Sequence, residues 1–282
     1  MKLSLILTTK NRARYLERAL AALIREKKEG YPNIEIVITD AGSTDGTVDI
    51  IRKNEAFIDK WLSKPDSGVS EGVNRALSLA TGDVVWMTGD DDIIVPGASI
   101  KMMAYLRERP HVDVVFAQNI MLVETTDGLV SPNPWPTPKT IGPVTKRTIC
   151  QNIYASFLIP ESAFFRKPCV DKVRGYNQEF HYFAFWDFLF RLKAVGAEMV
   201  AISEVVINHY STPLSDAHTA LSSPRWAREH ETVIYRHGGL YWLVWHRCHG
   251  RITASKVLDM IQRKLGAISG IHPRRWWERL FG

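Results

Sequence analysis

The sequence predicts an α/β fold in which a mostly parallel sheet is flanked by helices. Short apolar runs alternate with amphipathic segments through the first half of the chain, and this alternation is typical of parallel strands joined by helical crossovers. Polar clusters follow directly after several of the apolar runs. Sheets of this kind bind ligands at the carboxyl ends of their strands, so we expect one crevice along that edge.

The elements of the first half follow from hydrophobic periodicity. Residues 3–8 are apolar almost without alternation, which predicts a strand buried on both faces. Asn11 is a candidate N-cap for the helix behind it, which places Leu16, Leu20 and Leu23 on one face. Further along we expect strands at 34–39, 57–63, 84–88 and 112–116, with helices after the turn at 40–47, before Gly82 and from Pro96 to about Arg109.

The second half is divided from the first by a proline-rich stretch, residues 131–143, which we interpret as a loop within one domain. Beyond it we expect a strand at 163–166, a helix at 185–195, a strand at 199–207 and helices at 225–237 and 253–268. The predicted organisation is therefore one domain over 1–215, with halves 1–118 and 119–215, and a helical C-terminal extension over 216–282.

Composition narrows the class of protein. The 282 residues are 45% apolar and 23% charged, which is ordinary for a globular chain and excludes disordered, collagen-like and disulfide-rich classes. Three scattered cysteines suit a reducing compartment and argue against a structural zinc site. The N-terminus lacks the pattern of a signal peptide and no segment is apolar enough to span a bilayer. We therefore expect a cytoplasmic location.

The net charge of +6 lies in the C-terminal extension. Residues 240–282 hold eight Lys or Arg against Asp259 and Glu278, and the remaining chain is balanced. Residues 253–268 form an amphipathic pattern with tryptophans nearby, which suits peripheral binding to an anionic membrane surface. The alternative is a helix that packs on the body of the protein or on a second subunit.

Three consecutive carboxylates, Asp90 to Asp92, follow a predicted buried strand. Hard divalent cations such as Mg²⁺ or Mn²⁺ take oxygen ligands, and alternate residues of an extended turn point the same way, so Asp90 and Asp92 are candidate metal ligands. The alternative is a solvated acidic turn before a helix. Thr8, Asp40 and Asp66 also follow strands, where they would either bind a nucleobase or ribose or cap a loop.

Several ordered motifs together resemble the family 2 glycosyltransferases of the GT-A fold, in particular bacterial enzymes that build cell-surface polysaccharides. The motifs span roughly residues 1–210 and comprise Leu3–Arg12, Asp40–Thr47, Lys64–Leu77 and Ala80–Asp83 leading to Asp90–Asp92 and Pro96–Ala98.

The resemblance implies a nucleotide-sugar donor, most simply a UDP-sugar, a divalent metal (Mn²⁺ or Mg²⁺) at a DxD-type motif, and inversion at the anomeric carbon. Thr8 and Asp40 would hold the nucleobase with Asp66 nearby, Asp91 would contact ribose, and Asp92 is the best single candidate for a metal ligand. The remaining residues that we expect at the nucleotide-sugar site are Thr9, Asn11, Asn74 and Asp90.

The resemblance also implies a general base at the start of a helix in the second half. Asp187 and Arg191 match the family pattern, but Phe185 stands where the usual carboxylate is expected. Asp187 is therefore the candidate base, with Glu179 as the fallback. The alternative for Asp187 is an i,i+4 ion pair with Arg191, worth about 0.3–0.5 kcal/mol. Trp186 would stack on a sugar or pack in the core.

His209 follows a predicted strand and would complete the metal shell or contact the diphosphate; the alternative is a structural histidine. Glu161 and Arg166 lie in a segment that resembles the acceptor side. We therefore expect a metal-dependent glycosyltransferase that acts on a saccharide or lipid-linked acceptor, without a nucleic-acid partner. Two alternatives stay open: a nucleotidyltransferase, which the absence of a glycine-rich loop after the first strand disfavours, and a non-catalytic sugar-nucleotide-binding or membrane scaffold protein.

Overall fold

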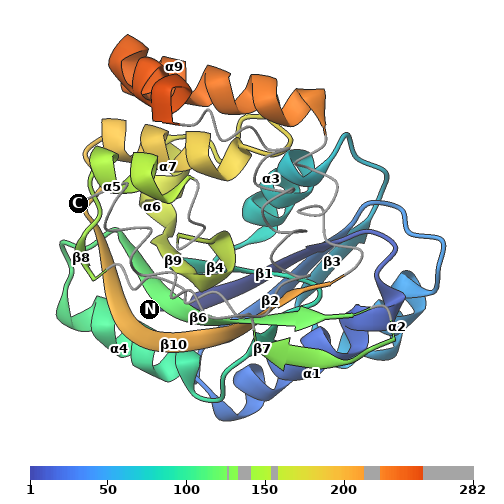
Figure 1. The fold of residues 1–282 in the computed structure, drawn as a ribbon. Helices are drawn as coiled ribbons and strands as arrows, with labels where there is room; N and C mark the ends of the chain where they lie inside the picture. The colour runs from blue at the N-terminus through green and yellow to red at the C-terminus, as the bar shows by residue number, and fades with distance from the viewer. Residues whose placement is uncertain (126, 133–140, 154–157, 213–222, 250–282) are drawn as a thin grey trace.

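A computed structural model describes residues 1–125, 127–132, 141–153, 158–212 and 223–249. A curved sheet forms the centre, helices lie on both of its faces, and one long helix lies outside the helices of one face (Figure 1). The strands are β1 (Leu3–Thr9), β2 (Ile34–Asp40), β3 (Lys60–Ser63), β4 (Val84–Thr88), β5 (Ile93–Ile94), β6 (Val114–Glu124), β7 (Val130–Pro132), β8 (Gly142–Pro143), β9 (Ala163–Arg166) and β10 (Met199–Ser211).

The sheet order is β3-β2-β1-β4-β9-β6-β10-β5, with β7 beside β6 and β8 beside β10. The predicted α/β class is confirmed, and strands β3, β2, β1 and β4 are parallel as expected. The second half is mixed, because β9 lies antiparallel between β4 and β6 while β6 and β10 are parallel. A 3₁₀ turn, Pro160–Ser162, leads directly into β9.

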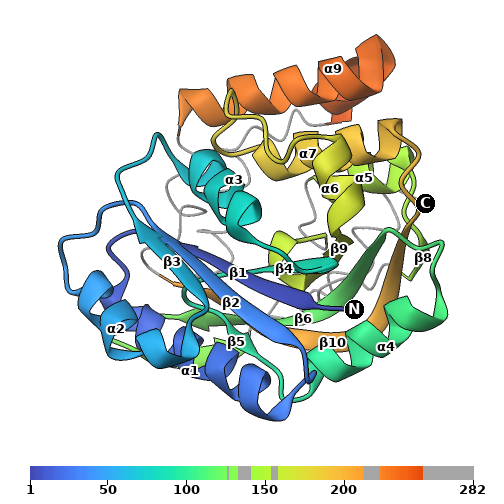
Figure 2. The same ribbon diagram turned by 180° about the vertical axis from the view of Figure 1, so that it is seen from behind.

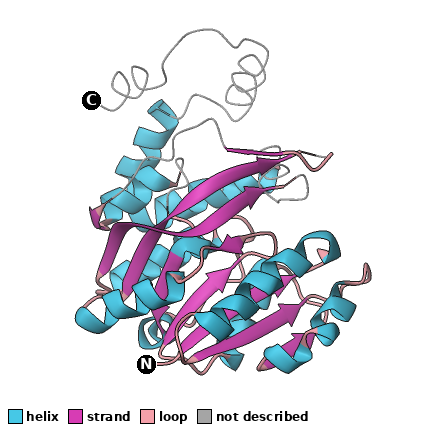
Figure 3. Ribbon diagram, turned by 90° about the horizontal axis from the view of Figure 1, so that it is seen from below, coloured by secondary structure: helices cyan, strands magenta, loops and turns pink. Residues whose placement is uncertain are grey.

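Helices cover the two faces separately. One face carries α1 (Ala13–Glu29), α2 (Thr47–Lys53) and α4 (Ala98–Glu108). The other carries α3 (Val69–Leu79), α5 (Lys146–Asn152), α6 (Lys167–Lys172) and α7 (Ala184–Ala194), and α9 (Pro224–His249) lies on α7 (Figures 1 and 2). Figure 3 shows the molecule from below, with the strands of the sheet in magenta and the helices around it in cyan.

The core consists of two apolar clusters, one on each face of the sheet. Leu3, Leu5 and Leu7 of β1 pack in the cluster under α1 and α4, whereas Ile6 packs in the cluster under α3 and α7. Successive side chains of a strand point to opposite faces, so a strand that is covered on both sides is apolar at most positions. This explains the nearly continuous apolar run from which β1 was predicted.

Several boundaries differ from the predicted ones. The third strand is shorter than expected because residues 55–57 form a 3₁₀ turn, and β6 and β10 extend beyond residues 116 and 207 to the polar edge. Asn11 does not cap α1. Its backbone is in the left-handed region, with φ at 52°, and the helix begins after Arg12 without a side-chain cap.

The predicted helix at 225–237 is confirmed as part of α9. The predicted helix at 253–268 lies outside the described residues, as do residues 133–140 of the proline-rich loop. Within the described part of the chain, no helix combines the length and the hydrophobicity needed to cross a bilayer.

Candidate active site

The polar residues that follow the strands do meet at one edge of the sheet. Thr9 of β1 pairs in register with Asp40 of β2, which in turn pairs with Ser63 of β3. Leu7 pairs with Thr88, so the chain leaves β4 toward Asp90 at the same edge. Strand β10 ends nearby, because the backbone N–H of Tyr210 donates to Asp92 at 2.9 Å. The convergence predicted from sequence is therefore present.

Asp92, Glu161 and His209 form a compact cluster at this edge. One ligand atom from each lies within 4.8 Å of the others, and Nδ1 of His209 lies 3.1 Å from Oδ1 of Asp92. The three residues come from the loop after β4, the 3₁₀ turn before β9 and the end of β10. The side chain of Asp92 is only 1% exposed, so its charge needs a partner.

Electrostatics in the cluster reflect this crowding. Burial raises the pKa of Glu161 to about 7, and the adjacent Asp92 carboxylate adds to the effect against the opposing influence of His209. Burial alone would lower the pKa of His209, but the carboxylates of Asp92, Glu161 and Asp91 raise it to about 10. Two carboxylates and an imidazole at this spacing are a donor set that fits a divalent cation such as Mn²⁺.

Asp90 and Asp91 precede Asp92 in the same loop and have different partners. Burial and the neighbouring Asp91 carboxylate raise the pKa of Asp90 to about 7, while Arg12, with Nε 3.7 Å from Oδ1 of Asp90, opposes the shift. Asp91 accepts a hydrogen bond from Thr212 at 3.1 Å. The structure thus groups Asp92 with Glu161 and His209 and directs Asp90 toward Arg12, whereas the sequence pattern had paired Asp90 with Asp92.

Asp40 is held within its own loop. Its carboxylate accepts the backbone N–H groups of Gly42 and Ser43 at 3.0 Å and the hydroxyl of Ser63 at 2.6 Å, and it also bonds the Ser43 hydroxyl. Asn11 accepts the backbone N–H of Thr44 at 2.9 Å. These bonds match the loop-capping alternative that the sequence left open, and they fix the loops beside Thr8 and Thr9.

Asp66 lies before α3 and Asn74 lies within it, and both side chains bond to backbone groups. Oδ1 of Asp66 accepts the backbone N–H of Gly68 at 3.0 Å, which shapes the turn before α3. Asn74 both donates to and accepts from the backbone of Tyr176, at 2.8 and 2.7 Å. Asn74 therefore ties α3 to the turn before α7, and its amide is engaged there.

Asp187 is buried in the first turn of α7 and is 1% exposed. Oδ2 accepts from Nε of Arg191 at 2.6 Å, and Oδ1 lies 2.8 Å from Nε2 of His237 in α9. Burial raises the pKa of Asp187, but these two partners outweigh it and the net shift is downward. The predicted ion pair with Arg191 is present, and a role as base stays a prediction that requires Asp187 to release one partner.

The residues predicted on the acceptor side separate in space. Trp186 is half-buried and packs against the core, 5.8 Å from the ring of Phe185. Arg166 pairs in register with Val84 at the start of β4 and donates to the carbonyl of Val112 at 2.7 Å. Because that is the opposite edge of the sheet, the structure does not bring Arg166 together with the acidic cluster.

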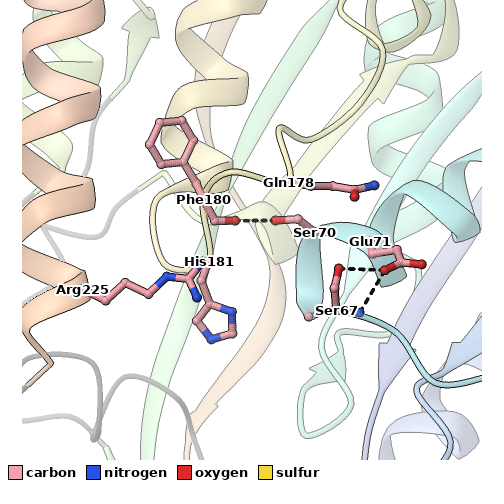
Figure 4. Close-up of a pocket in the computed structure, with 8 residues that line it drawn as sticks. Ser67, Ser70, Glu71, Gln178, Phe180, His181 and Arg225 are labelled. Carbon is pink, nitrogen blue, oxygen red and sulfur yellow. Dashed lines mark hydrogen bonds between the residues drawn. The ribbon is translucent and has the colours of Figure 1, made fainter.

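A shallow polar hollow opens between α3 and the loop before α7 (Figure 4). The hydroxyl of Ser70 donates to the carbonyl of Phe180 at 2.8 Å, and this bond joins the two sides of the hollow. Its lining residues are Ser67, Gly68, Ser70, Glu71, Gln178, Phe180, His181 and Arg225. The hollow thus lies between the half that carries Asp66 and the half that carries Asp187.

Three residues of this region were missed as site residues by sequence reasoning. Arg12 lies in the first motif, and that position was the only signal for it. His237 and Glu229 lie on α9, far along the chain from their partners. No local pattern in the sequence points from either residue to α7.

Comparisons with known proteins identify the family of the chain and several similar proteins. The family model described as "Glycosyl transferase family 2" matches residues 4–174. A "PGL/p-HBAD biosynthesis glycosyltransferase" of Mycobacterium bovis (strain BCG / Pasteur 1173P2) is 27% identical over 213 residues, which cover 74% of this chain and 76% of the relative. "Abequosyltransferase RfbV" of Salmonella typhimurium is 34% identical over 110 residues, or 38% of this chain and 33% of RfbV.

Two solved structures share the fold. S. aureus TarS 1-349 in complex with UDP-GlcNAc has a TM-score of 0.62 at 21% identity, and the match covers 83% of this chain and 67% of that 1-349 chain. The mannosyltransferase PcManGT from Pyrobaculum calidifontis, in complex with GDP-Man and Mn²⁺, has a TM-score of 0.61 at 14% identity and covers 99% and 83%. These two likenesses show that the chain has the GT-A fold.

The chain belongs to glycosyltransferase family 2, because the family model covers more than half of its length.

Proposed function

We propose that this protein transfers a sugar from a nucleotide-sugar, with inversion, to a saccharide or lipid-linked acceptor in the synthesis of a cell-surface glycan. The observation that carries the proposal is the cluster of Asp92, Glu161 and His209 at the carboxyl edge of the sheet. Solved relatives of the same fold bind UDP-GlcNAc or GDP-Man, one of them together with Mn²⁺.

The nucleotide would lie along the ends of β1, β2 and β4. Thr8, Thr9 and the loop that Asp40 stabilises would face the nucleobase, and Asp66 closes the same side. Asp91 would contact ribose, with Asp90 and Arg12 beside it. This assignment follows the register of the strands, which brings these loops to one edge.

Asp92, Glu161 and His209 would hold a divalent cation. When bound there, the cation would neutralise charge on the diphosphate leaving group. In place of Asp90, the donor set takes Glu161, which the sequence had placed on the acceptor side. The predicted Mn²⁺ or Mg²⁺ cofactor is therefore kept, with a revised set of ligands.

Inversion requires the acceptor hydroxyl to lose its proton to a general base, a step typically worth about 10²–10⁴-fold in rate. Asp187 is the candidate base, and it would have to exchange Arg191 or His237 for the acceptor. Glu179 is less suited, because it is exposed and ion-paired with Arg236 at 3.0 Å.

The C-terminal extension would bring the protein to its acceptor. Its net charge of +6 over residues 240–282 favours reversible binding to anionic lipid at the cytoplasmic face of a membrane. A lipid-linked acceptor would lie in the same plane. Sedimentation with vesicles that contain or lack anionic lipid, at low and high salt, tests this part of the proposal.

The decisive experiment is donor binding with and without Mn²⁺, measured by calorimetry across UDP- and GDP-sugars. We expect Mn²⁺ to strengthen donor binding, and Asp92→Asn and Glu161→Gln to remove most of that gain. The loss should be at least about 10-fold, the smallest loss typical even for an outer partner of a metal ligand. Asp49→Asn in α2, with its side chain 81% exposed, is the matched control.

Two results would contradict the assignment. If Asp90→Asn removes the Mn²⁺ effect while Glu161→Gln does not, the ligand pair predicted from sequence is correct and the cluster is not the metal site. If wild-type protein binds a donor with Mn²⁺ but transfers no sugar to any acceptor, a non-catalytic sugar-nucleotide-binding protein is favoured instead.

A further inference from the structure

Glu229 of α9 anchors the turn that leads into α7. The residue before α7, Phe183, provides no side-chain cap. The Glu229 carboxylate accepts the backbone N–H groups of His181 at 2.9 Å, Tyr182 at 2.7 Å and Phe183 at 3.3 Å, which lie directly before the first residue of the helix. A negative charge near the N-terminus of a helix also interacts favourably with the helix dipole.

Glu229 is itself firmly placed. It is 6% exposed, and Nε of Arg225 donates to its other oxygen at 2.6 Å. Burial raises the pKa of Glu229, but the three backbone donors and Arg225 outweigh it, so the net shift is downward. The carboxylate is therefore charged at neutral pH and holds the loop before α7 in one position.

Further contacts between α9 and the acceptor half reinforce this one. His237 contacts Asp187 in the first turn of α7 and stacks on the ring of Phe190 at 5.0 Å. Arg236 pairs with Glu179 in the loop before α7. All of these contacts are made to residues 179–190, so α9 packs against the segment that carries Trp186 and Asp187 (Figure 1).

The same loop forms one wall of the polar hollow between the two halves of the domain. His181 and Arg225 lie on one side of it and Ser67 and Glu71 on the other (Figure 4). The side chain of His181 also lies against Gly68, where an added Cβ would sit 3.2 Å from its Nδ1. A shift of this loop would therefore change the surface that faces the turn after Asp66.

We propose that Glu229 is a positioning residue for sugar transfer: by anchoring the turn before α7 from α9, it fixes the acceptor-side segment 181–187 opposite the donor half. The inference rests on the proposed function, and it extends the catalytic unit beyond residue 215 to include the first half of α9. The family model ends at residue 174, so it carries no information on this helix.

The test compares Glu229→Ala and Glu229→Gln with Glu231→Gln, an exposed position on the same helix. For each variant we measure hydrogen exchange of segment 177–187, donor affinity with Mn²⁺, kcat and acceptor KM. All measurements are made below the melting temperature of the least stable variant. We expect faster exchange at 181–183, unchanged donor affinity and a fall of up to about 10² in kcat/KM for acceptor, the loss typical of a misplacement near 1 Å. Glu231→Gln should behave as wild type.

The outcomes separate the two proposals. If Glu229→Ala transfers sugar as well as wild-type protein does, the positioning role is overturned. It is also overturned if donor affinity falls together with kcat/KM for acceptor. If hydrogen exchange at 181–183 stays slow in both Glu229 variants, Glu229 does not anchor the turn before α7. If wild-type protein transfers no sugar, the proposed function is contradicted instead. The exchange measurement would still decide whether Glu229 of α9 anchors the turn before α7.

Discussion

Glu35 offers a quantitative test of how the first half of the fold is held together. Its side chain is 2% exposed in β2. The carboxylate accepts from Lys2 at 2.5 Å, from the hydroxyl of Ser4 at 2.5 Å and from the backbone N–H of Thr81 at 2.5 Å. It therefore joins the start of β1 to β2 and to the loop before β4, at the edge opposite the candidate site.

The magnitude follows from the pKa of this carboxyl. Burial raises it, but the bonds from Lys2, Ser4 and Thr81 outweigh burial and lower the pKa from 4.5 to about 2. At about 1.4 kcal/mol per pKa unit, that difference contributes about 3 kcal/mol to the free energy of unfolding at pH 7. Because the folded-state pKa is lowered, the contribution is complete above pH 4.5 and is lost as the pH falls through 2. It should be about 2 kcal/mol at pH 3.5 and below about 1 kcal/mol at pH 2.5.

Glu35→Gln removes the charge and keeps the size of the side chain. We expect it to lower the free energy of unfolding by about 3 kcal/mol at pH 7, measured by urea denaturation, with a difference from wild type that shrinks toward acid pH. Glu17→Gln, at a side chain 68% exposed on α1, should change stability by less than about 0.5 kcal/mol. A Glu35→Gln variant as stable as wild type at pH 7, or one whose deficit is the same at pH 3.5, would refute the reasoning.

Two further predictions concern the acceptor half. Asp187→Asn should lower the free energy of unfolding by about 3 kcal/mol, because it breaks the ion pair between the buried Asp187 and the partly buried Arg191; if Asp187 is also the base, kcat falls by about 10²–10⁴ under conditions where the variant is folded, whereas unchanged kcat assigns it to anchoring alone. Gly175→Ala should destabilise the fold by more than about 1 kcal/mol, since φ is +67° and the new Cβ would lie 2.3 Å from Oδ1 of Asn74. Gly142→Ala, with φ at +108° and open space around it, separates backbone strain from this clash: equal thermal shifts in the two variants would show that the clash contributes nothing.

Sequence patterns predicted the order of elements well wherever a strand is covered on both faces. Strands β1, β2 and β4 are mostly apolar runs because both of their faces are buried; the buried polar exceptions near the starts of β1 and β2, Ser4 and Glu35, are hydrogen-bonded to each other. The polar residues after these strands were predicted to meet, and the strand register brings them to one edge. Topology alone is enough for this, since the carboxyl ends of parallel strands share an edge.

The direction of β9 was not readable from its four residues. A short apolar segment has the same pattern in either orientation, and only its place between β4 and β6 makes it antiparallel. Arg166 shows the consequence, because the end of an antiparallel strand lies at the edge opposite the site.

By itself, the sequence determined the fold class and predicted that Asp92 and His209 would lie at one edge of the sheet, because these follow from local periodicity and from motif order. Only the tertiary structure decided that Glu161 completes their cluster and that Asp187 is bonded to His237 of α9. Those contacts join residues 48 or more positions apart. Such pairs depend on how helices pack on the sheet, and local patterns carry no record of that packing.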